Sequence, residues 1–263
     1  MKISLCQINI QAGNIQHNHA IARLALIEAV QQGGHLAILP ELWSSGYDLS
    51  NAILQSHSSP EILADLTDLS NQYKISIGGS LLEQATNQLF NTFTLLRPDA
   101  QPVSYQKTHL FRLVDEHRWL SPGHQTVMTN LGDFKVGLSI CYDLRFPELY
   151  RGYALNGVNL FLICAEWPTR RIEHWNTLLR ARAIENQSFV VAVNTVGISG
   201  SATYGGSSLV ISPWGETILQ ASATEEEIIT CDIDPLQLTN VRTHLPVFSD
   251  RRPEVYEIPP AER

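Results

Sequence analysis

The chain has 263 residues, of which 44% are hydrophobic and 17% are charged, and its formal net charge is −8. This composition is typical of a globular protein that is large enough to bury a substantial core. The negative charge and the lack of a dense Lys/Arg run argue against a nucleic-acid-binding protein. No apolar stretch approaches the roughly 20 residues that a membrane span needs. We therefore expect neither a nucleic acid nor a membrane among its partners.

The chain contains four cysteines, and no two of them form a CxxC pair. A disulfide framework or a zinc site is therefore not expected, and the pattern favours a reducing compartment, the cytoplasm. The first ten residues, MKISLCQINI, alternate like a strand and lack the long apolar region of a signal peptide. We interpret Cys6, Cys164 and Cys231 as packing residues.

The first half of the chain predicts the element order β-α-β-α-β-β. Hydrophobic periodicity and run length place these elements at residues 1–10, 17–30, 35–39, 60–70, 75–82 and 90–97. Gly33 and Gly34 follow the first helical stripe, as is typical of a helix end. A short alternating strand follows at the start of the stretch 103–111.

The second half repeats this order. Its strands are predicted at 134–140, 158–163, 189–193, 208–211 and 217–219, and its helices at 147–156 and 172–186. A last strand is predicted at 228–233, and no linker-like break separates the halves. We therefore expect an α/β fold in which two similar βαβαββ halves pack into one sandwich within one domain.

The prediction assigns residues 1–234 to this domain and residues 235–263 to a C-terminal arm or tail. Beyond Asp234 the sequence is rich in proline and predicts irregular structure. Two interpretations stay open for it. It is either a surface tail or an arm against a second subunit, because apolar residues such as Phe248 and Tyr256 have no obvious place in the sandwich.

The stretch 135–150, KVGLSICYDLRFPELY, joins a buried strand to a helix that begins at Pro147. Cys141 lies between them, at the carboxyl end of the strand, where ligands usually bind in open α/β sheets. A thiolate and backbone N–H groups on such a turn can face the same cleft, as nucleophilic attack requires. The alternative is a buried packing cysteine. The polar run that follows it, YDLRFPE, favours a nucleophile.

A cysteine nucleophile needs a base for its proton, and Glu41 is the first candidate. It comes directly after the buried strand 35–39 and Pro40. Desolvation at such a place raises the pKa of a carboxyl group toward the range of a general base or acid at neutral pH. A surface glutamate at a strand end is the alternative.

The nucleophile also needs a positive group, and Lys107 is the candidate. It lies in VSYQKTHLF, at the end of the short alternating strand. Beside Cys141, its ammonium group would lower the thiol pKa and bind a developing oxyanion. A solvated surface charge is the alternative.

Three stretches resemble the signatures of the carbon–nitrogen hydrolase, or nitrilase, superfamily. They are PELW with Glu41, YQKTHLF with Lys107 and GLSICYDLRFPELY with Cys141, in the order of that family. The resemblance covers nearly the whole chain. It implies an αββα sandwich that dimerises into a four-layered assembly, so we expect a homodimer or higher homo-oligomer. It also implies a Glu–Lys–Cys triad and no metal or organic cofactor.

The resemblance implies a mechanism as well. Glu41 takes the proton of Cys141, and the thiolate attacks an amide carbon. Lys107 and the backbone N–H of Tyr142 stabilise the oxyanion, ammonia leaves, and water hydrolyses the thioester. Glu116 lies nine positions after Lys107, about where the family carries a second glutamate that orients the lysine. A competing candidate is its neighbour, Asp115.

Within the superfamily, CYDLRFPE resembles the amidase-like branch, because true nitrilases typically carry Trp-Glu after the cysteine. The stretches HLFR, AEWP, HWNTLLRARAIENQ and PVF resemble ω-amidases, which deamidate 2-oxoglutaramate and 2-oxosuccinamate. The resemblance thus implies a 2-oxo dicarboxylate monoamide as substrate, with water. Three alternatives share the fold: a deaminated-glutathione amidase, an N-carbamoyl amidase and a nitrilase. A non-catalytic interaction protein is the alternative outside the enzymes, and the intact triad argues against it.

Such a substrate carries a carboxylate at its far end, which predicts a cationic or hydroxyl-bearing pocket. Arg145 is one candidate, although an ion pair with Asp143 or Glu148 is the favoured interpretation. Other cations that would serve are Arg112, Arg170 and Arg171. Aromatic candidates for the pocket wall are Trp167, Tyr47 and Trp43, and packing in the core is the alternative for Trp167.

Overall fold

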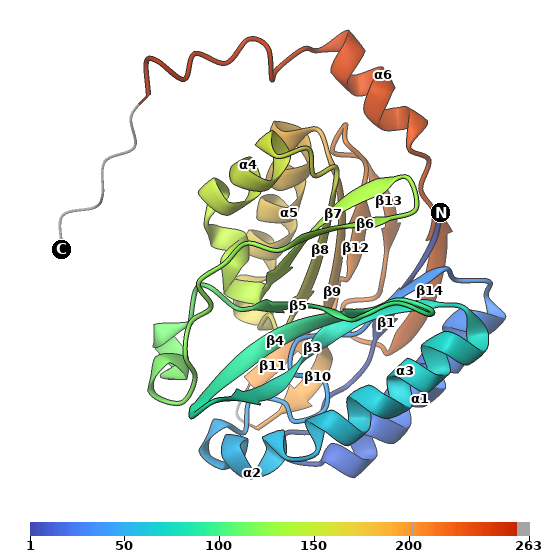
Figure 1. Cartoon of the computed structure of the whole chain (residues 1–263), viewed down its shortest axis with the longest axis vertical. Coiled ribbons are helices and arrows are strands. Elements are labelled where there is room, and N and C mark those ends of the chain that lie inside the picture. Colours follow the sequence, from blue (N-terminus) through green and yellow to red (C-terminus); the bar gives the residue numbers. More distant parts are fainter. Residues whose placement is uncertain (201, 257–263) are drawn as a thin grey trace.

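Two mixed β-sheets pack face to face, and helices cover their outer faces (Figure 1). In this computed structural model the residues described are 1–200 and 202–256. The layers follow the order α, β, β, α, and each sheet is built mainly from one half of the chain. The prediction of an α/β sandwich with two similar halves is therefore confirmed.

The first sheet has six strands in the order β14-β1-β2-β3-β4-β5. Strands β1, β2 and β3 are parallel to one another. The other strands pair antiparallel: β14 with β1, β4 with β3, and β5 with β4. The bounds are β1 Lys2–Gln7, β2 Leu36–Ile38, β3 Ser76–Ala85, β4 Gln88–Leu96, β5 Val103–Gln106 and β14 Glu227–Asp232.

The second sheet has the order β13-β12-β9-β8-β7-β6 and repeats this plan. Strands β7, β8 and β9 are parallel, and antiparallel strands extend the sheet on both sides. The bounds are β6 Met128–Leu131, β7 Phe134–Ile140, β8 Leu160–Ala165, β9 Phe189–Asn194, β12 Leu209–Ile211 and β13 Thr217–Gln220. Strand β8 and most of β9 are apolar runs, because both of their faces are buried.

Helices α1 (Ile15–Gln31) and α3 (Ser59–Tyr73) cover the first sheet, and α4 (Pro147–Leu155) and α5 (Ile172–Asn186) cover the second (Figure 1). The main core lies between the sheets, where side chains of both, such as Phe93 and Leu138, belong to one buried cluster. A further cluster joins α1 and α3 to the first sheet. Among the described residues, no helix is long and apolar enough to cross a membrane.

The C-terminal segment differs from the prediction of an irregular tail. Residues Leu236–His244 form helix α6, which packs Leu238 and Val241 into the protein. The prolines flank this helix, with Pro235 at its start and Pro246 after its end, so they bound it and do not interrupt it. Phe248 packs against the main core, whereas Tyr256 is half exposed. The rest of the predicted tail, residues 257–263, lies outside the described residues.

Several short elements of the structure were not predicted from the hydrophobic periodicity of the sequence. They are α2 (Ala52–Ser56), β6, and a hairpin formed by β10 (Val196–Ser199) and β11 (Ala202–Gly205). Each is too short to show a clear period in the sequence. Residues of the hairpin line the main cavity of the protein, so the hairpin bears directly on the site.

Candidate active site

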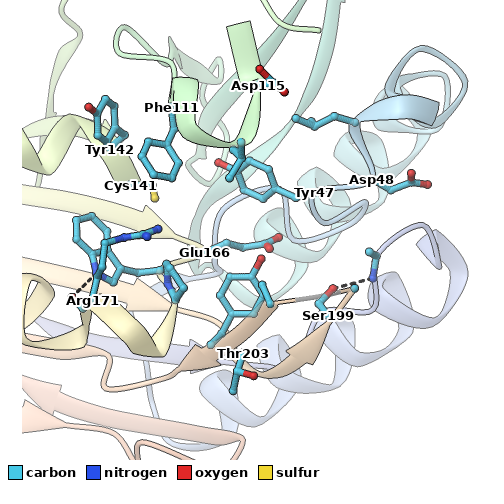
Figure 2. A pocket seen from close by; sticks show the side chains of 18 of the residues that line it. Tyr47, Asp48, Phe111, Asp115, Cys141, Tyr142, Glu166, Arg171, Ser199 and Thr203 are labelled. Atoms are coloured by element: carbon cyan, nitrogen blue, oxygen red, sulfur yellow. Dashed lines mark hydrogen bonds between the residues drawn. The ribbon is translucent and has the colours of Figure 1, made fainter. Parts of the chain in front are cut away.

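Cys141 lies on a sharp turn directly after β7. The turn is a single stretch of 3-10 helix over Cys141–Arg145, and Cys141 itself has a φ of +45°. This left-handed conformation is strained for a residue with a Cβ atom, so the fold must hold it in place. The side chain is 7% exposed and lines the main cavity (Figure 2). The turn thus presents a sulfur atom to the cavity from the carboxyl end of a buried strand.

Asp143 holds this turn from inside the protein. One carboxylate oxygen accepts hydrogen bonds from the backbone N–H of Ile140 at 2.9 Å and the hydroxyl of Tyr105 at 2.8 Å. The other accepts from the backbone N–H of His109 at 3.0 Å and contacts its Nδ1 at 2.7 Å. Asp143 is fully buried. It therefore ties the cysteine turn to the segment around Lys107.

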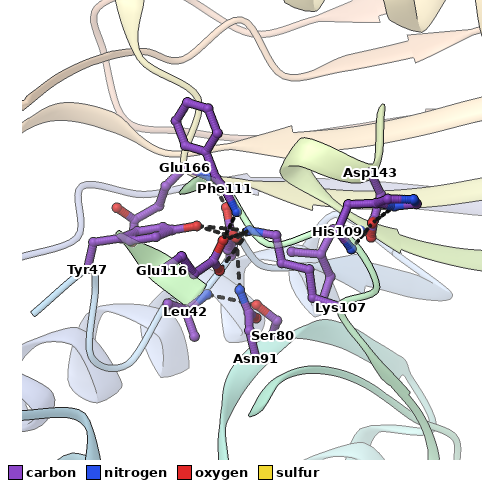
Figure 3. A network of polar contacts seen from close by, with 12 residues as sticks. Leu42, Tyr47, Ser80, Asn91, Lys107, His109, Phe111, Glu116, Asp143 and Glu166 are labelled. Carbon is purple, nitrogen blue, oxygen red and sulfur yellow. Dashed lines mark hydrogen bonds and ion pairs between the residues drawn. The ribbon is translucent and has the colours of Figure 1, made fainter. Parts of the chain in front are cut away.

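Glu41 lies beyond the end of β2 and is fully buried. Its Oε1 atom accepts hydrogen bonds from the Tyr47 hydroxyl at 2.6 Å, Asn91 Nδ2 at 2.9 Å and Lys107 Nζ at 2.8 Å. Its Oε2 atom accepts one from the backbone N–H of Glu166 at 2.9 Å. These bonds come from both halves of the chain and fix the carboxylate in one orientation (Figure 3).

Lys107 follows β5 and is also fully buried. Besides Glu41, its Nζ atom lies 2.9 Å from each carboxylate oxygen of Glu116 and 3.1 Å from the Tyr47 hydroxyl. Glu116 in turn accepts a hydrogen bond from the backbone N–H of Phe111 at 2.6 Å. Asp115, the competing candidate, is exposed and pairs with Arg118. The structure thus brings Glu116, and not Asp115, to the lysine.

The pKa values of Glu41 and Cys141 both differ from what the sequence led us to expect. Burial raises the pKa of Glu41, but the Lys107 ammonium and hydrogen bonds from Lys107, Tyr47 and Glu166 outweigh it, so this pKa lies below its usual range. Burial, followed by the negative charge of Glu41, raises the pKa of Cys141 well above its usual value, although Lys107 acts in the opposite direction. The resting pair is therefore a thiol and a carboxylate.

That pair is suited to general-base catalysis. A neutral thiol is a weak nucleophile, and a carboxylate beside it can take its proton as it attacks. The charges of Glu116 and Glu41 raise the pKa of Lys107 well above its usual value despite its burial, so the lysine is a permanent cation. Among the residues that the structure describes, no group of three His, Cys, Asp or Glu side chains is arranged to hold a metal ion.

A cavity of about 1070 Å³ opens beside Cys141 (Figure 2). Tyr47, Trp167, Arg145, Arg170 and Arg171 all line it. Asp48, Asp115 and Glu166 line it as well, so the three arginines form a cationic part of a cavity of mixed charge. That part suits a ligand that carries a carboxylate.

The structure decides two alternatives around this cavity. The Arg145 guanidinium lies over the Trp167 ring, 4.8 Å from its centroid, and 3.3 Å from Nδ1 of His174. The ion pair with Asp143 or Glu148 that the sequence favoured is wrong, because Asp143 is occupied by His109 and the turn directs Arg145 toward the cavity. Trp167 lines the cavity and is also almost fully buried in the core, so both interpretations of this residue, pocket wall and core packing, are correct.

Two further predictions for the pocket are also corrected. Trp43 is buried in the cluster between α1, α3 and the first sheet, and it does not line the cavity. Leu42, just before it, has a φ of +42°, and this turn directs Trp43 away from the site. Arg112 is exposed and lies outside the cavity lining.

Sequence reasoning missed three residues of the site. Glu166 and Tyr204 line the cavity, and Asn91 binds Glu41. Glu166 had a weak signal, because it comes directly after a buried apolar strand, as Glu41 nearly does. Tyr204 and Asn91 had none, because they reach the site from a short hairpin strand and from the middle of β4.

Comparisons with known proteins agree with this geometry. The sequence model of the Carbon-nitrogen hydrolase family matches residues 2–243. The 2-oxoglutaramate amidase of Bacillus subtilis (strain 168) is 37% identical over 257 residues, which cover 97% of this chain and 98% of that protein. The chain therefore belongs to the carbon–nitrogen hydrolase family.

Solved structures have the same fold. A CN-hydrolase superfamily protein from Xanthomonas campestris, with an arsenic adduct in its active site, superposes with a TM-score of 0.91 at 30% identity and covers 96% of this chain and 97% of that chain. A mutant amidase from Nesterenkonia sp. AN1, with the acetamide moiety of fluoroacetamide covalently added at the active-site cysteine, has a TM-score of 0.86 at 26% identity, with coverages of 97% and 95%.

Proposed function

We propose that this protein is a thiol-dependent amidohydrolase of the ω-amidase type. It cleaves the terminal amide of a small 2-oxo dicarboxylate monoamide to the acid and ammonia. One observation carries the proposal: Cys141, held in a strained turn, borders a cavity with a cationic part, directly beside the buried Glu41–Lys107–Glu116 group. The 2-oxoglutaramate amidase of Bacillus subtilis, 37% identical to this chain, supports the choice of substrate.

The first step forms a thioester. Glu41 takes the proton of Cys141, the sulfur bonds to the amide carbon, and the carbonyl electron pair moves to its oxygen. Lys107 and the backbone N–H of Tyr142 stabilise this oxyanion. The protonated Glu41 then gives its proton to the amide nitrogen, the carbon–nitrogen bond breaks, and ammonia leaves. The covalent adduct at the cysteine of the Nesterenkonia amidase supports the nucleophilic role of Cys141 in this step.

The second step hydrolyses the thioester. Glu41, again a carboxylate, takes a proton from water, and the resulting hydroxide attacks the thioester carbon. The sulfur leaves and regains its proton from Glu41. Glu116 holds Lys107 through both of its oxygens, 2.9 Å away, so that the cation keeps its place as charge develops and disperses. Tyr47 donates a hydrogen bond to Glu41 and in this way orients the base.

The cationic part of the cavity determines the substrate class in this proposal. Arg145 and Arg171 bind the far carboxylate, and Trp167 holds Arg145 in place by stacking. Burial, with Arg170 and Arg145 as neighbours, lowers the pKa of Arg171 somewhat, and a bound carboxylate relieves this repulsion. A simple alkyl amide has no group that would use these charges.

We also propose a cytoplasmic homodimer. The cysteines are free, which is consistent with a reducing compartment. Large apolar side chains are half exposed around α4, α5 and α6; they are Leu155, Ile184, Trp214 and Leu245. Together with residues 235–256, which extend along that side in Figure 1, they offer an apolar surface for a second copy. Sedimentation velocity would test this, and a monomer at micromolar concentration would contradict it.

Ammonia release tests the activity. The purified protein is incubated with 2-oxoglutaramate, 2-oxosuccinamate, glutamine and an N-carbamoyl amino acid, and Cys141→Ala is the control. Release from the 2-oxo amides that is lost in the variant supports the proposal. Release only from other substrates, or carbon dioxide beside ammonia, would favour another hydrolase of this fold. If no substrate gave Cys141-dependent release, a non-catalytic interaction protein would be the better interpretation.

A further inference from the structure

Glu166 is a second acidic group of this site that the mechanism above does not use. It follows β8 directly, is 4% exposed and lines the same cavity as Cys141 and Tyr47 (Figure 2). Its backbone N–H donates to Glu41, which places the two glutamates next to each other. The side chain of Glu166 has its own place in the cavity, separate from the Glu41–Lys107 contact.

The carboxyl group of Glu166 has no partner at full hydrogen-bond geometry, although the Tyr204 hydroxyl lies close enough to lower its pKa against the effect of burial. Within residues 1–200 and 202–256, no backbone or side-chain group bonds either of its buried oxygens. Buried polar atoms are nearly always bonded, so an unbonded carboxyl that borders a cavity calls for a ligand. Burial, followed by the negative charge of Glu41, raises the pKa of Glu166 well above its usual value. This shift favours the neutral acid, which carries one O–H donor.

Tyr204 of the hairpin strand β11 lies close to this carboxyl and lines the same cavity. Burial, and then a negative charge on Glu166, raise the pKa of Tyr204 above its usual value. The phenol is therefore also neutral. The two side chains form a small polar region of the cavity wall next to Glu41.

The substrate class offers one atom for this region. In the mechanism above, the amide oxygen is bound by Lys107 and Tyr142, and the far carboxylate by Arg145 and Arg171. The remaining polar atom of a 2-oxo dicarboxylate monoamide is its 2-oxo oxygen, a neutral acceptor that needs a donor. We propose that Glu166 donates a hydrogen bond to this oxygen and thereby determines specificity for 2-oxo amides. This inference rests on the proposed function.

The same contact also disfavours 2-amino amides. A protonated amino group, as in glutamine, offers no acceptor to the O–H of Glu166 and brings a positive charge toward three arginines. The arginines therefore discriminate by repulsion, and Glu166 discriminates through the lost bond to the 2-oxo oxygen. A methylene group at the same position leaves the Glu166 donor unbonded, which also reduces transition-state binding.

The test compares two substrates that differ only at this position: 2-oxoglutaramate and glutaramate, which has a methylene group in place of the 2-oxo group. We measure kcat/KM for both with the wild type, Glu166→Gln and Glu166→Leu. The wild type should prefer the 2-oxo substrate. Glu166→Leu should reduce that preference by roughly tenfold, the size of one lost neutral hydrogen bond. Glu166→Gln keeps an N–H donor and should keep most of the preference.

Three results would overturn the inference. A wild type with equal kcat/KM for both substrates would do so without any variant, even if Glu166→Leu failed to fold. An equal loss for both substrates in Glu166→Leu would assign Glu166 a structural role, and an unchanged preference would leave it no role. Glu61→Gln, at an exposed position on α3, serves as the matched control for the change of charge. Failure of the proposed function is distinct: the wild type would release no ammonia from 2-oxoglutaramate.

Discussion

The Nζ atom of Lys107 lies 2.9 Å from each carboxylate oxygen of Glu116, and both side chains are fully buried. The same ammonium group lies 2.8 Å from Glu41. One buried cation, Lys107, thus forms ion pairs with two carboxylates, Glu41 and Glu116. Such an arrangement is costly to desolvate and is stable only when every member is bonded. The consequences of disturbing it can be measured.

Replacing Lys107 with Met should abolish activity and destabilise the protein. The variant leaves Glu41 and Glu116 as neighbouring buried carboxylates without a cation, and breaking a buried pair in this way costs about 3–5 kcal/mol. The free energy of unfolding in urea and the rate of ammonia release test both effects. Arg118→Met, at an exposed ion pair with Asp115, is the control and should change stability by less than about 1 kcal/mol. A stable Lys107→Met protein would contradict the paired arrangement.

The thiol of Cys141 should stay protonated well into the alkaline range. Absorbance near 240 nm reports thiolates, and the difference between wild type and Cys141→Ala isolates this residue from the other three cysteines. Since the negative charge of Glu41 raises the pKa of Cys141, Glu41→Gln should move the thiolate transition to lower pH. A Cys141 thiolate already present in the wild type at pH 7 would show that Lys107 outweighs burial and Glu41.

Glu166→Gln should make the protein relatively more stable as pH rises. The ordinary pKa of the carboxyl is 4.5, and in the folded protein it lies well above that value. The folded state therefore holds this proton more tightly than the unfolded state, and wild-type stability falls from about pH 4.5 upward until the folded pKa is reached. The difference in unfolding free energy between variant and wild type should grow by up to about 1.4 kcal/mol per pH unit.

Urea titrations of both proteins between pH 4 and pH 8 measure this difference. Glu61→Gln, whose position is exposed, should show no comparable trend with pH. A constant difference for Glu166→Gln across this range would mean that Glu166 is ionised in the folded protein.

Cys141→Gly should be more stable than Cys141→Ala. At a φ of +45° a side chain with a Cβ atom is strained, whereas glycine adopts this conformation freely. The expected gain is about 1 kcal/mol, and both variants lack the sulfur, so the comparison isolates the backbone. Unfolding in urea measures it. Equal or lower stability of Cys141→Gly would contradict strain at the cysteine turn.

Arg145→Gln should raise KM for 2-oxo amides by about tenfold while changing hydrolysis of an uncharged amide such as butyramide much less. The reason is that a charge-assisted bond to the substrate carboxylate is lost. Arg112→Gln removes the same charge outside the cavity and is the matched control. Similar losses for both amides would indicate that Arg145 supports the fold of the site and does not bind the carboxylate.

The order of the main elements and the residue types of the site were predictable from the sequence. Each buried strand and each amphipathic helix has a local period, so the αββα plan with two similar halves was predictable. Glu41, Lys107 and Cys141 each come at or just beyond the end of a strand, and the family motifs around them are local too. Their chemical roles remain proposals, but the structure does bring them together.

The effect of these groups on one another depends on the three-dimensional arrangement of the chain. Glu41 receives hydrogen bonds from Lys107 and Glu166, 66 and 125 positions away in the sequence, and these lower the pKa that burial alone would raise. The orientation of Arg145 toward Trp167, and the unbonded carboxyl of Glu166, likewise depend on neighbours from other elements. Electrostatics acts through space, so distance along the chain carries no information about it.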